Sequence, residues 1–83
     1  MTERELQDER QLRLIEALRV ARKRSSMSQV ELANRLGKRQ QFVSKYESGE
    51  RRLDFFEVLD VANALGLTIE SLLRSIESKS ASN

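Results

Sequence analysis

Three glycines interrupt a chain that otherwise favours helix, and their positions limit how it can fold. Gly37, Gly49 and Gly66 are its only glycines, and the 83 residues include no proline. Long side chains of high helix propensity dominate the rest, and no segment alternates polar and apolar residues as a strand would. The segments between the glycines are long enough only for short helices joined by tight turns. The sequence therefore predicts a small all-α domain.

Apolar residues at three- and four-residue spacing predict five helices. They cover residues 3 or 10 to 24, 29–36, 40–48, 55–65 and 69–76. Ser28 with Glu31 and Asp54 with Glu57 have the spacing of capping boxes, which satisfy the free amides at a helix start. Each glycine lies just past the end of a predicted helix, where a left-handed residue ends it.

The ends of the chain differ from its middle. Residues 1–10 form a polar extension, either separate or continuous with the first helix through a capping box of Thr2 and Glu5. We expect residues 11–77 to form the domain. Residues 78–83, SKSASN, are polar apart from one alanine, so we expect a disordered tail.

Composition excludes several classes of function. The chain has no cysteine and no histidine, which excludes disulfides, thiolate metal sites and imidazole catalysis. We therefore expect no enzyme, no cofactor and no metal, and without a separate ligand domain we expect no small-molecule ligand. Acidic residues near the N-terminus and the lack of a long apolar run predict a soluble, cytoplasmic protein with no membrane contact.

Charge is unevenly distributed along the chain. The formal net charge is +2, but residues 19–52 carry +7 and the remaining residues carry −5. A basic middle between acidic ends favours a localised anionic partner, although small proteins also show such unevenness by chance.

The helices at 29–36 and 40–48 are only three residues apart. Helices joined this tightly must cross at a large angle, as in a helix-turn-helix. That geometry needs a small residue for close approach, a residue that accepts positive φ in the turn, and an aliphatic side chain that enters the core. Ala33, Gly37 and Val43 stand at those places.

The segment SQVELANRLGKRQQFVSKYESGERR resembles the helix-turn-helix of the phage-repressor and Cro-like transcription regulators, also called the xenobiotic-response-element type. The matching residues are Ser28, Gln29, Leu32, Ala33, Leu36, Gly37, Val43, Glu47 and Gly49. The resemblance extends over about residues 14–76. It implies a five-helix lambda-repressor-like fold and a homodimeric, sequence-specific regulator of transcription, most often a repressor, that reads the major groove of double-stranded DNA with its third helix.

The resemblance also implies roles for individual residues. Arg22 and Glu47 would form a structural ion pair, and Gln29 would hold the DNA backbone. The outward face of the third helix would read bases through Gln40, Gln41, Ser44 and Lys45. Helical geometry agrees, because inward Val43 and Tyr46 leave those four on or near the opposite side. Glutamine suits adenine in the major groove, and lysine suits guanine or phosphate.

Arg39 departs from the family pattern. The residue before the third helix is commonly Ser or Thr, which caps the helix. Arginine there loses a cap worth about 1 kcal/mol and adds a cation at the positive end of the helix. This placement favours a nearby phosphate or base edge. The expected phosphate clamps are Lys38, Arg39, Arg51 and Arg52.

Several alternatives remain open from the sequence. The polar and basic residues could simply be solvated, and Phe42 could pack on the core or face a thymine methyl. The apolar stripe of the fifth helix could close the core, form a homodimer seam, or both; its residues are Ile69, Leu72, Leu73 and Ile76. The alternative function is an antitoxin or adaptor that binds a protein partner through the acidic segment 3–9 and autoregulates through the same helix-turn-helix.

Overall fold

A computed structural model describes residues 2–81, except for the side chains of residues 6, 7 and 78–81. Within that range the chain forms five helices and no strand, as the sequence predicts. The helices are α1 (Glu3–Arg24), α2 (Gln29–Leu36), α3 (Gln40–Ser48), α4 (Phe55–Ala64) and α5 (Ile69–Ala81).

The start of α1 decides between the two expected beginnings of the first helix. The Thr2 hydroxyl accepts a hydrogen bond from the Glu5 amide at 3.1 Å, and the Glu5 carboxylate accepts one from the Thr2 amide at 2.9 Å. This capping box begins the helix at Glu3, so the polar extension is continuous with α1. The boxes at Ser28 and Asp54 also form.

The end of α5 differs from the expected boundary at residue 77. The helix continues to Ala81, so residues 78–81, which were expected in a disordered tail, are helical. Ser, Lys and Ala all tolerate helix, and a helix already under way extends at little cost. Residues 82 and 83 of the expected tail lie outside the described residues.

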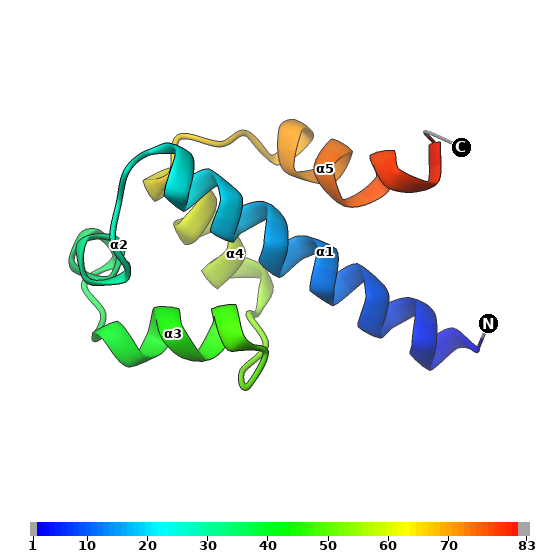
Figure 1. Cartoon of the computed structure of the whole chain (residues 1–83), viewed down its shortest axis with the longest axis horizontal. Helices are drawn as coiled ribbons and strands as arrows, with labels where there is room; N and C mark the ends of the chain where they lie inside the picture. Colours follow the sequence, from blue (N-terminus) through cyan, green and yellow to red (C-terminus); the bar gives the residue numbers. More distant parts are fainter. Residues whose placement is uncertain (1, 82–83) are drawn as a thin grey trace.

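The helices are arranged around α1, which crosses the middle of the molecule (Figure 1). Helix α3 lies on one side of α1 and α5 on the other. Helix α2 is seen end-on while α3 lies in the plane of the view, so their axes cross steeply. Gly37 makes the turn between them with φ +67°, a left-handed value that favours glycine, and its amide bonds back to α2. The predicted helix-turn-helix is therefore present.

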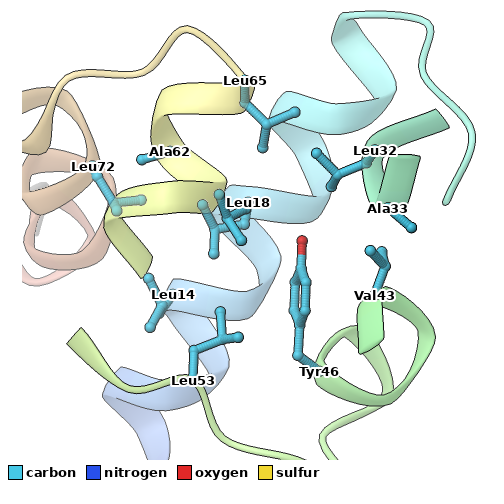
Figure 2. Close-up of a cluster of buried hydrophobic side chains, with 11 residues drawn as sticks. Leu14, Leu18, Leu32, Ala33, Val43, Tyr46, Leu53, Ala62, Leu65 and Leu72 are labelled. Atoms are coloured by element: carbon cyan, nitrogen blue, oxygen red, sulfur yellow. The ribbon is translucent and has the colours of Figure 1, made fainter. Parts of the chain in front are cut away.

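Each helix contributes to one hydrophobic core (Figure 2). Leu18 of α1 sits at the centre between α4 and the α2–α3 pair, and Val43 enters from α3 as expected. Both are fully buried. The Tyr46 ring also points inward, and burial raises the pKa of its hydroxyl. The core thus holds the inner face of α3 and leaves its other face free.

The expected dimer seam on α5 needs a correction. Leu72 is only 3% exposed and belongs to the core of its own chain, where a second copy cannot reach it. Ile76 is partly buried against the same core, and Ile69 is partly buried as well. Leu73, at 52% exposure, is the fully exposed member of the stripe. The stripe therefore mostly closes the core, because α5 packs along α1.

Leu18→Ala should lower the free energy of unfolding by about 2–5 kcal/mol, because it opens a cavity at the centre of the core. The matched control is Leu12→Ala on the same helix, where the side chain is 65% exposed. The control should change stability by no more than about 0.5 kcal/mol. Urea denaturation followed by circular dichroism measures both, and equal losses would contradict the assigned packing of α1.

Candidate nucleic-acid interface

The expected ion pair of Arg22 and Glu47 lies between the end of α1 and the end of α3. Arg22 Nε and Nη2 donate to the two carboxylate oxygens of Glu47 at 2.7 and 2.9 Å. The third donor, Nη1, bonds the Met27 carbonyl at 2.7 Å in the α1–α2 turn. Both charged side chains are less than 10% exposed. The pair therefore joins α1, the following turn and α3 through a buried bidentate contact.

The same carboxylate also holds the start of α2. Gln29 Nε2 donates to Glu47 Oε1 at 3.0 Å, and Gln40 Nε2 in turn donates to Gln29 Oε1 at 3.4 Å. A continuous hydrogen-bond chain thus runs from Arg22 to the first residue of α3. Gln29 was expected to hold the DNA backbone. In the structure its side-chain oxygen also accepts from Gln40, so it orients the Gln40 side chain as well.

Two opposing effects set the pKa of Glu47. Burial raises it, but the hydrogen bonds from Arg22 and Gln29 and the charge of Arg22 lower it by more. The net result is a pKa below the ordinary value of 4.5. Glu47 therefore stays charged at neutral pH and keeps Arg22 neutralised.

The two faces of α3 differ as helical geometry predicts. Val43 and Tyr46 are buried, whereas Gln40, Gln41 and Lys45 are exposed. Ser44 is half-buried, and its hydroxyl donates to the Gln41 carbonyl at 3.3 Å. The exposed face thus carries two amides and one ammonium group, which can donate to base edges and phosphates; the amide oxygens can also accept. Their contact with bases remains a prediction.

The start of α3 has no side-chain cap. Arg39 occupies the N-cap position with extended backbone angles, φ −82° and ψ 157°, but makes no capping hydrogen bond. A serine in this geometry would satisfy an amide of the first turn. Both Lys38 and Arg39 are exposed here. The free amides and two cations form an electropositive site at the end of the helix.

Phe42 connects this site to the loop after α3. Its ring meets Tyr46 edge-on at 5.7 Å, and the side chain is partly buried against the core. Lys38 Nζ lies 5.2 Å and Arg51 Cζ 4.9 Å from the ring centroid. These contacts favour the packing role of Phe42 over contact with a thymine methyl. The ring also positions two of the expected clamps.

Sequence reasoning missed the acidic partners of Arg51 and Arg52. Arg51 donates to both carboxylate oxygens of Glu57 at 2.8 and 2.6 Å. These bonds, together with one from the Asp54 amide, lower the pKa of Glu57 to about 2. Arg52 bonds Asp8 of α1 at 2.9 Å. A phosphate would compete with a carboxylate at both arginines. The Arg52–Asp8 pair is largely exposed on both sides and is the weaker competitor.

Comparison with known proteins agrees with this geometry. The helix-turn-helix family matches residues 18–72. The chain belongs to this family, in its Cro/C1 or XRE type. It is similar to the solved structure of an XRE-family like protein from Pseudomonas syringae pv. tomato str. DC3000, with 38% identity and a TM-score of 0.85. The similarity covers 92% of this chain and 93% of that one. No curated protein matches the chain.

Family membership establishes the coarse function. Helix-turn-helix domains of the XRE family bind DNA and serve in transcription regulation, and the family is not enzymatic. The lambda-repressor-like fold expected from the sequence is confirmed. Among residues 2–81, none of the helices is both long enough and apolar enough to span a membrane.

Glu47→Gln should destabilise the protein by roughly 3 kcal/mol at pH 7, because Arg22 then stays buried without its counter-charge. The wild-type advantage is present above the unfolded pKa of Glu47 and is lost as pH falls through the lower folded pKa. The difference between the two proteins should therefore be constant from pH 6 to 8 and shrink below about pH 4.5. Chemical denaturation across this range tests it; a difference independent of pH would contradict the ion-pair role.

Arg39→Ser should raise stability by about 1 kcal/mol by adding the missing cap, while weakening binding to all DNA sequences. Arg39→Gln is the matched control, since it removes the same charge without supplying a preferred cap. It should lose DNA affinity to a similar extent with a smaller gain in stability. Thermal unfolding and binding to a random duplex measure the two effects separately. Unchanged DNA affinity in both variants would show that Arg39 does not face the phosphates.

Proposed function

We propose that this protein is a sequence-specific regulator of transcription that binds double-stranded DNA as a homodimer and acts as a repressor. The observation that carries the proposal is the exposed face of α3, where Gln40, Gln41 and Lys45 stand opposite the buried Val43 and Tyr46. An α-helix with its side chains is about 10–12 Å across. Such a helix fits the major groove, which is about 12 Å wide.

Different side chains would supply specificity and affinity. Gln41 is the leading candidate for base readout, since its amide can form a bidentate pair with adenine worth about 1–3 kcal/mol of discrimination. Gln40 donates a hydrogen bond to Gln29, so the two side chains would already be oriented before DNA binds. Lys38 and Arg39 at the start of α3 would bind phosphates, with Gln29 at the start of α2. Arg51 and Arg52 would also bind phosphates, after each exchanges its carboxylate partner within the chain for a phosphate.

A homodimer matches the way such helices read DNA. Two copies related by a two-fold axis would place their α3 helices about 34 Å apart in successive major grooves of a palindromic site. Occupying such a site excludes other proteins from the same DNA, which is the simplest way for a domain of this size to repress transcription. A regulator that binds DNA must share its compartment, and a cytoplasmic location is part of this proposal.

An antitoxin or adaptor role is the second candidate. The first turns of α1 extend past α3 and α4, and Glu3 and Glu5 are exposed there (Figure 1). An acidic projection of this kind could dock a basic protein partner while α3 binds DNA. A stoichiometric partner that copurifies, and still does so after Gln40→Ala and Lys45→Ala, would favour this candidate.

Gln41→Ala and Lys38→Ala test base readout and phosphate binding together. DNA sites selected from a random pool by wild-type protein provide the operator. Gln41→Ala should reduce discrimination between operator and random duplex by about 1–3 kcal/mol, whereas Lys38→Ala should weaken binding to both alike and reduce the salt slope by about 1. Binding of the wild type should weaken strongly with salt. A flat salt response, or no preference for selected sites, would contradict the proposed function.

A further inference from the structure

Two adjacent aromatic side chains are exposed at the start of α4. Phe55 and Phe56 are 66% and 72% exposed, and their rings meet edge-on with centroids 5.6 Å apart. Three other large apolar side chains in the described range are also exposed, but each is on a different helix: Leu12, Val30 and Leu73. The phenylalanines therefore form a patch, which single apolar residues do not.

Helix α4 carries apolar residues on two faces. Its inner face, with Val61 and Ala62, is buried in the core. Leu59 follows Phe55 by four residues and Phe56 by three, so the three side chains lie on one outer face, where Leu59 is half-buried. A surface helix of a monomer normally has one apolar face. The aromatic face of α4, defined as Phe55, Phe56 and Leu59, is thus available to a partner.

The position of the aromatic face matches the demands of two-fold DNA binding. The loop after α3 brings the start of α4 close to the C-terminal end of α3, whereas α5 lies on the other side of α1 (Figure 1). When two α3 helices enter successive grooves on one side of a duplex, the copies must touch along a flank beside α3. The start of α4, which carries the aromatic face, lies on the α3 side of α1, and α5, which carries Leu73, lies on the other side (Figure 1).

We propose that a second copy of this chain covers the aromatic face of α4, with the two α4 helices packed antiparallel across a two-fold axis. This inference rests on the proposed function and replaces α5 with α4 as the dimer interface. A two-fold axis brings the same patch of each copy together, so Phe55 and Phe56 of one copy pack against the same residues of the other. Aromatic side chains are enriched at the centre of such interfaces.

Charges at the two ends of the aromatic face are self-complementary. Arg52 precedes it, with a side chain that is 62% exposed and bonded to Asp8 of its own chain, an exposed pair weak enough to be exchanged. Asp60 follows Phe56 by four residues, is exposed, and forms no ion pair within residues 2–81. In an antiparallel arrangement, the Arg52 end of one copy lies beside the Asp60 end of the other. Opposite charges at a rim set register and orientation, which favours a second copy over an unrelated protein.

The area of the face predicts a weak dimer. Phenylalanine buries about 150–250 Å² when fully covered, so the exposed parts of both rings amount to roughly 280 Å² in each copy. A stable interface buries about 1,200–2,000 Å² in total. The two aromatic faces together contribute roughly 560 Å², well below that range, so the free chain should dimerise weakly. Binding of both copies to adjacent half-sites raises their effective concentration and completes the dimer on DNA.

The double variant Phe55→Ser/Phe56→Ser tests this interface, and Leu73→Ser on α5 is the matched control. Both remove exposed apolar groups without changing charge, so phosphate attraction is unaltered. We expect the double variant to lose cooperative binding to the selected palindromic operator, with apparent affinity at least about tenfold lower, and to bind a duplex of one half-site as the wild type does. Leu73→Ser should match the wild type on both duplexes.

Sedimentation without DNA provides the second readout. The wild type and Leu73→Ser should self-associate as concentration approaches about 1 mM, and the double variant should remain monomeric. Circular dichroism checks that all three are folded. Retained cooperativity in the double variant, its loss in Leu73→Ser, or a wild type with neither self-association nor cooperativity would overturn the inference. Failure to bind any duplex would instead remove the proposed function, and sedimentation would still decide the interface.

Discussion

The buried pair of Arg22 and Glu47 is the contact on which the geometry of the proposed DNA-binding face depends. Removing two charges from water is costly, and the cost is offset only if each has good partners. Here Arg22 uses donors on Glu47 and on the Met27 carbonyl, and Glu47 also accepts from Gln29. These contacts are directional, whereas apolar packing is not. They therefore fix the end of α3 relative to α1 and the start of α2.

The two ends of α3 consequently have different character. Its C-terminal end is held by the ion pair and followed by Gly49, while its N-terminal end has no cap and carries the exposed Arg39. Phe42, between them, packs on the core and positions Lys38 and Arg51. One end is thus stabilised within the protein, and the other leaves its free amides and cations for an external anion. This asymmetry suits a helix that approaches DNA with its start.

Helix α4 shows how one apolar run can serve two purposes. Val61 and Ala62 close the core, and the Arg51–Glu57 pair holds the start of the helix to the loop after α3. The aromatic face points away from both. In the sequence, FFEVLDVANAL is simply an apolar helix with a capping box, and nothing in its spacing separates a face that its own chain buries from one that another chain would cover.

The sequence alone determined the local structure: the five helices, the left-handed turn at Gly37, the inward Val43 and Tyr46, and the candidate pair of Arg22 and Glu47. These depend on spacing within a few turns of helix or on a family pattern. Only the tertiary structure decided which acids hold Arg51 and Arg52, that Leu72 belongs to the core, and that Phe55 and Phe56 remain exposed. The reason is physical. Asp8 and Arg52 are 44 residues apart, and whether a helical face is buried depends on which other helices cover it, a property that periodicity does not contain.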